Sequence, residues 1–229
     1  MGNALCFSPE LFQFLEDLKR HNNRDWFQQN KERYVTQVRD PMLGFIQAFA
    51  PRLHKISPHY VADDRLIGGS LMRINRDIRF SPDKSPYKTM AGAMFRHEKG
   101  KSSPAPLYFL HLERGNSFAG IGVHHPEPPA LGKIRQKIAS DPNGWKAATS
   151  GKDFQTTCRF FGDSLQRPPR GFAPDHPCID DLKRKEFCTQ TFFTDRQVCS
   201  AEFVERFSDV CGAASEFMRY LTLALTLRW

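Results

Sequence analysis

The spacing of apolar residues changes twice along this chain, and the change restricts the folds that it can adopt. Over residues 9–20 apolar side chains recur at helical spacing, directly after Ser8-Pro9, which is a favourable helix start. In the middle, short alternating runs are separated by Gly, Pro and Ser clusters. From Ser200 onward helical spacing returns. The pattern predicts an α+β fold, with a central, mostly antiparallel sheet flanked by N-terminal and C-terminal helices.

The individual elements can be placed along this frame. Helical sequence is expected from Arg24 to about Lys55, with a kink or restart at Asp40-Pro41, because proline disfavours helix at the residue before it. Further helices are expected over 130–139, 141–149 and a long stretch after Ser200. Strands are expected over 71–80, 91–95, 107–114 and 118–124, with further edge strands at 156–161 and 187–193. A turn at 114–117 predicts that the strands on either side of it pair as an antiparallel hairpin.

The chain shows no sign of division or of membrane insertion. It has no internal repeat, and its Pro-rich stretches at 126–129 and 168–174 are short, so we expect one domain over residues 1–229. No run approaches the roughly 20 apolar residues that span a bilayer. The cysteines form no C-x-x-C pair and follow no secretory leader, which predicts mostly buried, reduced thiols in a cytoplasmic protein. They are Cys6, Cys158, Cys178, Cys188, Cys199 and Cys211.

A basic segment, Leu71–Lys88, is the most distinctive part of the sequence. The net charge of the chain is +8, which favours anionic partners such as nucleic acid, nucleotides or phosphorylated metabolites. In this segment, five cations accompany two acids: Arg73, Arg76, Arg79, Lys84 and Lys88 with Asp77 and Asp83. If 71–80 is a strand, Arg73, Asp77 and Arg79 share one face, and the guanidinium forks keep donors for a carboxylate or phosphate. The alternative is a charged edge strand whose cations discourage aggregation.

Histidines supply the candidate groups for proton transfer. His111 lies within a predicted strand, and His124 and His125 end the next, so the hairpin would let His111 approach one of the later pair. Together with Asp175-His176 they suggest a metal site. No H-E-x-x-H spacing is present, however, and no metal ligand is predicted. The candidate catalytic residues are Tyr87 and His125.

A second basic region follows the middle helices. The irregular stretch RPPRGFAPDH (167–176) presents Arg170 and His176, and the run DDLKRKE (180–186) adds Lys183 and Lys185. A solvated helix end explains this run equally well. If it faces Arg73 and Arg79, the two regions would form one basic cleft.

Sequence motifs of known catalytic sites are missing. The chain has no G-x-x-x-x-G-K-[ST], no G-x-G-x-x-G and no G-x-S-x-G. Gly120-Ile121-Gly122 lies within a predicted strand, where glycine is typical of a bulge or a close backbone approach.

Four motifs give the chain a family resemblance: NRDWFQQNKERY (23–34), GGSLMRINRDIRFSPDKSPYKT (68–89), GIGVHHPEPP (120–129) and RPPRGFAPDHPCIDDLKRKEF (167–187). With these, the chain resembles the domain-of-unknown-function family 2461, conserved hypothetical proteins of bacteria and fungi, over nearly its whole length. The resemblance implies no established activity. It implies that the candidate residues match the family's own motifs: Arg73, Arg76, Asp77, Arg79, Phe80, Lys84, Pro86, Tyr87, Lys88, His125, Arg170, Asp175, His176, Lys183 and Lys185. Family members tend to carry His where Met90 stands and an aromatic residue where His124 stands.

Three hypotheses follow, and no cofactor is identified. The first is a site for a small phosphorylated or carboxylated ligand, with or without a reaction. Its ligand-binding residues would be Arg73, Arg76, Asp77, Arg79, Lys84, Lys88, Arg170, His176, Lys183 and Lys185. The second is a structural or interaction module in which the Arg/Asp motif is an internal ion-pair network. The third is a nucleic-acid binder whose basic surface follows phosphates.

Overall fold

Six strands form one antiparallel sheet in the computed structural model, which describes residues 7–100 and 104–229. The strands are β1 (Tyr60–Val61), β2 (Ala91–His97), β3 (Leu107–Leu112), β4 (Ser117–Val123), β5 (Arg159–Phe161) and β6 (Phe187–Phe193). Their order across the sheet is β1-β2-β3-β4-β6-β5, with every pair antiparallel. The predicted hairpin is confirmed as β3 and β4, whereas β6 lies inside the sheet and only β5 forms that edge.

Helices precede, interrupt and follow the strands. The N-terminal group is α1 (Pro9–Arg20), α2 (Arg24–Gln29), α3 (Lys31–Tyr34), the π-helical turn η1 (Val35–Arg39) and α4 (Asp40–Ile56). The middle group is α5 (Pro128–Ser140), α6 (Pro142–Ser150), α7 (Lys152–Thr157) and α8 (Ile179–Leu182). The C-terminal group is α9 (Asp195–Val198), α10 (Phe203–Ala213) and α11 (Ser215–Ala224). The α+β prediction is confirmed.

Three helix predictions can be compared directly with the structure. The helix over residues 9–20 and the restart at Asp40 are confirmed. The single long helix after Ser200 is wrong, because the chain turns at Ala214 between α10 and α11. Small residues surround this turn, and a glycine such as Gly212 costs about 1 kcal/mol in a helix interior relative to alanine.

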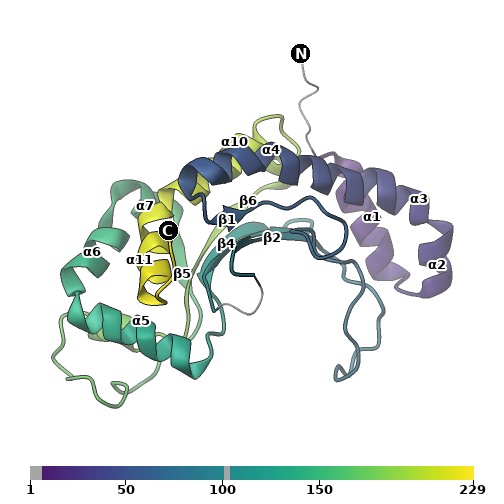
Figure 1. Ribbon diagram of the computed structural model, residues 1–229. Helices are drawn as coiled ribbons and strands as arrows, with labels where there is room; N and C mark the ends of the chain where they lie inside the picture. Colours follow the sequence, from purple (N-terminus) through teal and green to yellow (C-terminus); the bar gives the residue numbers. More distant parts are fainter. Residues whose placement is uncertain (1–6, 101–103) are drawn as a thin grey trace.

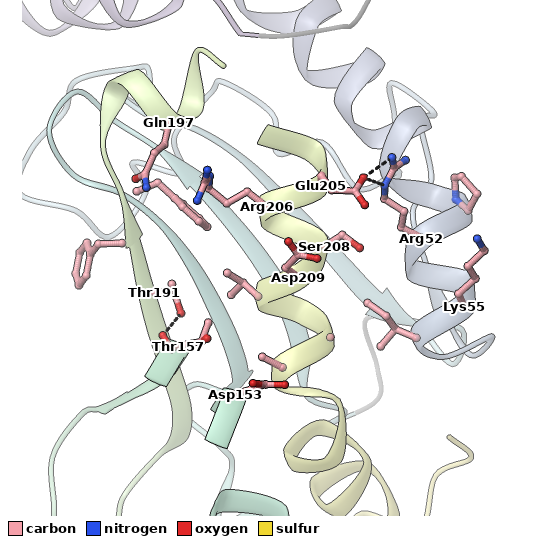
Figure 2. A pocket seen from close by; sticks show the side chains of 17 residues that line it. Arg52, Lys55, Asp153, Thr157, Thr191, Gln197, Glu205, Arg206, Ser208 and Asp209 are labelled. Atoms are coloured by element: carbon pink, nitrogen blue, oxygen red, sulfur yellow. Dashed lines mark hydrogen bonds and ion pairs between the residues drawn. The ribbon is translucent and has the colours of Figure 1, made fainter. Parts of the chain in front are cut away.

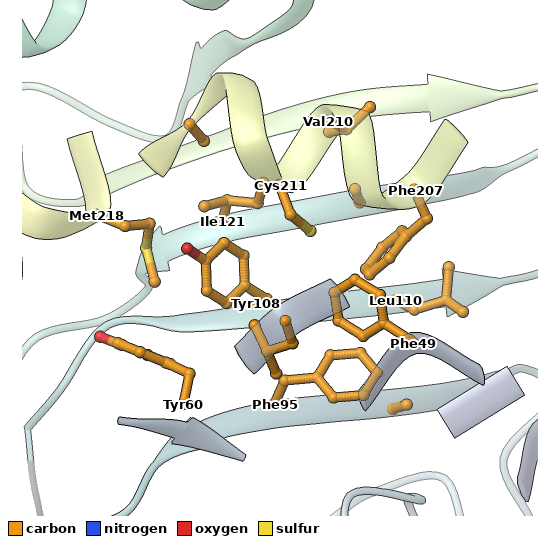
Figure 3. Close-up of a cluster of buried hydrophobic side chains, with 14 of the residues drawn as sticks. Phe49, Tyr60, Phe95, Tyr108, Leu110, Ile121, Phe207, Val210, Cys211 and Met218 are labelled. Carbon is orange, nitrogen blue, oxygen red and sulfur yellow. The ribbon is translucent and has the colours of Figure 1, made fainter. Parts of the chain in front are cut away.

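The core lies between one face of the sheet and the helices α4 and α10, which cross it (Figure 1). Alternate strand residues point into it, including Phe95, Leu110 and Ile121, which are almost completely buried. Figure 3 shows these side chains beneath α10, where Phe49 and Phe207 pack edge to face at 5.0 Å between ring centroids. The N-terminal and C-terminal helices therefore share one core on one side of the sheet.

The intervening strand residues form a second face that is only partly buried. Strand pairing aligns them in rows across β2, β3, β4 and β6: Gly92–His111–Phe118–Phe192 and Met94–Phe109–Gly120–Gln190. The next row is Leu107–Gly122–Cys188, and Arg96 directly follows the last β2–β3 pair, Phe95–Tyr108. The sheet is curved, with its convex face toward α4 and α10, so this open face is the concave one (Figure 1). With about 4.8 Å between strands, a row from β2 to β6 spans about 14 Å.

The predicted strand over 71–80 is wrong. Residues 71–90 form a loose, folded-back arm along the edge of β2, with only isolated bridges at Leu71–Ala93 and Asn75–Tyr87. Asp77 accepts a hydrogen bond from the backbone N–H of Arg79, and Asp83 does the same for Ser85. Such local turns compete with a strand ladder, and the prolines at 82 and 86 lack the N–H that a ladder needs.

Two further predictions concern the thiols and membrane insertion. Cys158, Cys178, Cys188 and Cys211 are buried, as expected for most of the thiols, and Cys6 lies outside the described residues. Within residues 7–100 and 104–229, no helix is long and apolar enough to cross a membrane.

Candidate functional site

A hollow of about 620 Å³ opens where the arm leaves the edge of β2. Its lining consists of Leu66, Ile67, Gly68, Gly69, Ser70, Leu71, Met72, Arg73, Lys88, Met94 and Arg96. All of the charged residues in this lining are cations, namely Arg73, Lys88 and Arg96. The two limbs of the arm supply Arg73 and Lys88, and the open face of β2 supplies Arg96.

No acidic residue lies in the described lining beside these three cations. The Lys88 ammonium donates hydrogen bonds to the backbone carbonyls of Arg73, at 2.7 Å, and Asn75, at 2.5 Å. Burial, followed by repulsion from Arg73 and Arg76, lowers the pKa of Lys88, and burial likewise lowers the pKa of Arg96. The guanidinium of Arg96 donates to the sulfur of Met94. In the described part of the chain, none of the three lining cations forms an ion pair, although Arg73 attracts the nearby carboxylate of Asp77 electrostatically. The lining therefore carries a net positive charge, which favours an anion.

The rest of the hollow is largely apolar. Leu66 and Ile67 are exposed, the latter at 91%, and Leu71, Met72 and Met94 complete the wall. Exposed apolar side chains beside converging cations are typical of a site that binds an organic anion. The cations hold the charged group of such a ligand, and the apolar wall contacts its carbon skeleton.

The tip of the arm, residues 76–85, uses its charges locally. Arg76 pairs with Asp83, and Arg79 pairs with Asp77 at 2.7 Å. Hydrogen bonds from Arg79 hold the pKa of Asp77 below its usual range. Hydrogen bonds from Ser85 and Arg76 likewise lower the pKa of Asp83. Lys84 donates to the carbonyl oxygen of residue 78. Three of the predicted ligand-binding cations are therefore engaged within the tip, two of them in local ion pairs.

Tyr87 lies in the core and outside the lining of the hollow. Its side chain is 5% exposed and its ring stacks on Phe27, with 4.1 Å between centroids. Its role in proton transfer stays a prediction.

The second basic region lies at the opposite edge of the sheet. Arg170 is exposed, and His176 accepts a hydrogen bond from the backbone N–H of Cys178. Lys183 pairs with Asp180, and Lys185 lies 3.7 Å from a carboxylate oxygen of Asp163. Lys183 and Lys185 lie just before β6, and His176 approaches the carbonyl oxygen of Ala139 in α5. Arg73 belongs instead to the arm beside β2, and β3 and β4 separate β2 from β6. The two regions do not face one another as the single-cleft prediction required.

A buried carboxyl group, Glu186, joins the two later histidines. Its Oε2 atom lies 3.0 Å from Nδ1 of His124, and its Oε1 atom pairs with Nδ1 of His125. The thiol of Cys188 donates to Oε2 at 3.7 Å. Burial, with the neighbouring Glu186, raises the pKa of that thiol. The left-handed backbone of His125, with φ of 49°, lets consecutive imidazoles reach the same carboxyl group.

Sequence reasoning missed Glu186 and misplaced His111. Residues 124, 186 and 188 fall on the open face by the alternation of their strands, but the pairing of β4 with β6 brings together segments about sixty residues apart. His111 lies beside the β3–β4 turn, stacks on Phe118 and approaches Glu113 at 3.3 Å. It is therefore two rows away from the end of β4, and its predicted approach to the later histidines is wrong.

A second hollow, of about 1030 Å³, lies over α10 beside α4 and β6 (Figure 2). Its charged lining is balanced: Arg52, Lys55 and Arg206 with Asp153, Glu205 and Asp209. Arg52 pairs with Glu205 at 2.7 Å. Balanced charge gives no preference for an anion, so the smaller basic hollow is the stronger candidate.

Comparison with known proteins identifies a family and no activity. No curated protein and no solved structure matches the chain. The family model described as a conserved hypothetical protein (DUF2461) matches residues 10–220, a range that includes the arm, the basic hollow and Glu186. The chain therefore belongs to this family of conserved hypothetical proteins, DUF2461.

Proposed function

We propose that the protein binds a small organic anion, phosphorylated or carboxylated, in the hollow formed by Arg73, Lys88 and Arg96. The observation that supports this most strongly is the convergence of three cations with no acidic residue in the lining. Like charges held together repel, and a bound anion with several oxygens would relieve that repulsion while accepting hydrogen bonds from the guanidinium groups. The apolar wall at Leu66 and Ile67 suits the carbon skeleton of such a ligand.

The surrounding charges favour a small ligand over a long nucleic acid. The tip cations Arg76 and Arg79 are already paired, so the basic surface does not continue along the arm as a stripe. His125 follows the end of β4, two strands away from β2, which is about 10 Å by strand spacing alone. A small ligand held at Arg96 would not reach it, which supports a binding role for the hollow that is independent of His125.

Calorimetric titration with simple anions tests the proposal. Inorganic phosphate, citrate and AMP are suitable probes, in low-salt buffer. Replacing Arg73 or Arg96 with Gln should weaken binding of the best probe at least about tenfold, since hydrogen bonds to charged groups contribute about 1.5–3 kcal/mol. Arg79→Gln is the matched control, because this arginine lies in the same arm with its own partner, and it should bind normally.

Two results would count against the proposal. One is that the wild type binds none of the three probes at low salt. The other is that Arg79→Gln weakens binding as much as Arg73→Gln, which would indicate nonspecific attraction to a basic surface. Tighter binding of a single-stranded oligonucleotide, falling steeply with salt, would favour a nucleic-acid function instead.

A further inference from the structure

We propose that His124, Glu186 and Cys188 form a binding site for a divalent transition-metal ion, with zinc as the best match to their chemistry. The site lies at the end of β4 and the start of β6, apart from the basic hollow, and does not depend on the proposed function. The spacing of histidines along the sequence predicted no metal, because these ligands come from two strands that only the fold brings together.

The separations between the three donor atoms suit one small ion. Nδ1 of His124 lies 3.0 Å from Oε2 of Glu186, and Sγ of Cys188 lies 3.7 Å from the same oxygen. The three donor atoms all lie within 4.8 Å of one another. In a tetrahedral zinc site with ordinary bond lengths, such N···O and S···O edges are about 3.3 and about 3.6 Å. Only small side-chain movements would be needed to admit the ion.

Burial and charge at Glu186 point the same way. Its side chain is 7% exposed, and its direct partners in the described structure are two imidazoles and a thiol. Arg184 acts on the neighbouring Cys188 electrostatically and forms its ion pair with Asp181. A buried carboxylate needs a compensating positive charge. Nitrogen, oxygen and sulfur donors together are the set that zinc prefers, and a site with three protein ligands leaves one position for water or another ligand.

The fold leaves room for this arrangement through two glycines with left-handed backbones. A Cβ at Gly162, where φ is 98°, would lie 2.7 Å from Oε2 of Glu186. A Cβ at Gly122, where φ is 124°, would lie 2.1 Å from the carbonyl oxygen of Phe187 and prevent β4 and β6 from approaching. Side chains at either position would crowd the carboxyl group or separate its partners.

His125 has a different place in the arrangement. It pairs with Oε1, while His124 and Cys188 converge on Oε2. We assign it as a positioning residue that holds the carboxyl group from its other oxygen. Such outer partners typically change metal affinity 10- to 100-fold.

Titration of metal-free, untagged full-length protein with Co²⁺ tests the site, because a cobalt–thiolate bond gives a charge-transfer absorption in the near ultraviolet. The wild type should show this band, and added Zn²⁺ should remove it by competition. Cys188→Ser should abolish the band, and His124→Phe should weaken Co²⁺ binding at least about tenfold. His125→Asn should keep the band and weaken binding less than His124→Phe.

Matched variants separate this site from adventitious binding. Cys158→Ser and Cys199→Ser should keep the absorption band. His111→Asn should keep it as well, because His111 also contacts a glutamate but has no thiol beside it. His124 is more than half exposed, so His124→Phe should fold even if a change at Glu186 does not. The proposal fails if the wild type binds neither ion, if bound Co²⁺ shows no thiolate band, or if Cys188→Ser leaves the band unchanged.

Discussion

Asn22 and Tyr87 are joined by a pair of reciprocal hydrogen bonds across 65 positions of sequence. The side-chain amide of Asn22 donates to the carbonyl oxygen of Tyr87 at 3.0 Å, and the N–H of Tyr87 donates to Oδ1 of Asn22 at 3.1 Å. Asn22 lies between α1 and α2, so this contact attaches the arm to the N-terminal helices. The limb of the arm that presents Lys88 to the hollow is therefore held from outside the arm.

Replacing Asn22 with Ala should destabilise the protein by about 1–3 kcal/mol, because the N–H and C=O of Tyr87 are left without partners. Asn22→Asp keeps the acceptor for the N–H of Tyr87 but sets a carboxylate oxygen against the carbonyl oxygen of Tyr87, so it should also destabilise the protein. Urea unfolding measures both, and hydrogen exchange should show faster exchange of the Tyr87 amide in Asn22→Ala. Equal stability of Asn22→Ala and the wild type would contradict the attachment.

Tyr87→Phe should leave stability within about 0.5 kcal/mol of the wild type, because the ring that stacks on Phe27 is kept. Tyr87→Ala should cost about 3–5 kcal/mol through the cavity that it leaves. Thermal unfolding distinguishes the two. If an activity is found, its loss in Tyr87→Phe with an unchanged melting temperature would support the predicted proton transfer.

Local signals in the sequence predicted the helices and the hairpin well. Ser8-Pro9 marks the first residue of α1, and the turn after Arg114 joins β3 to β4. The arm was mispredicted because its alternation at 71–80 is typical of a strand, while its aspartates and prolines stabilise local turns. No local pattern indicates that β6 inserts between β4 and β5, since that order depends on pairing between distant segments.

The candidate sites were predictable only in part. Clustered charge identified Arg73 and Lys88, which line the hollow. A lone arginine within a strand gives no such signal, so Arg96 was missed, and Glu186 was missed because its partners are distant in sequence. The two later histidines were noticed as a pair, but their common partner required the register of β4 and β6.

Arg79→Ala should leave the melting temperature unchanged, because both Arg79 and its partner Asp77 lie exposed at the tip of the arm. Lys88→Ala should by contrast cost about 1 kcal/mol or more, because the ammonium bonds two backbone carbonyls. Thermal unfolding of the two variants tests the ion-pair hypothesis for the whole motif. A large loss of stability in Arg79→Ala would support that hypothesis and would mean that the tip of the arm helps to hold the fold.

Stability should fall in mildly acidic solution through His111. Burial lowers the pKa of this imidazole below 6.5, although Glu113 opposes the shift and is itself close to Lys19. The folded state therefore takes up a proton less readily than the unfolded state, so the stabilisation is present above about pH 6.5 and is lost as pH falls through the folded pKa. The advantage of the wild type over His111→Gln in urea unfolding should shrink from about pH 8 to about pH 5. A constant difference would contradict this role of His111.

Gly122→Ala and Gly120→Ala should differ sharply, although the two glycines lie on the same face of β4. At position 122 a Cβ would approach the carbonyl oxygen of Phe187 to 2.1 Å, and the backbone φ of 124° is one that alanine rarely adopts. At position 120 the nearest atoms would be 3.5 Å away, which is ordinary contact. We expect a cost of at least about 2 kcal/mol for Gly122→Ala and less than about 1 kcal/mol for Gly120→Ala. Urea unfolding measures both costs. Faster exchange of the backbone amides that join β4 and β6 in Gly122→Ala would show that the loss of stability arises at this strand pair. Equal tolerance of the two substitutions would mean that the strands do not approach this closely, and the convergence of His124 and Cys188 on Glu186 would lose its structural basis.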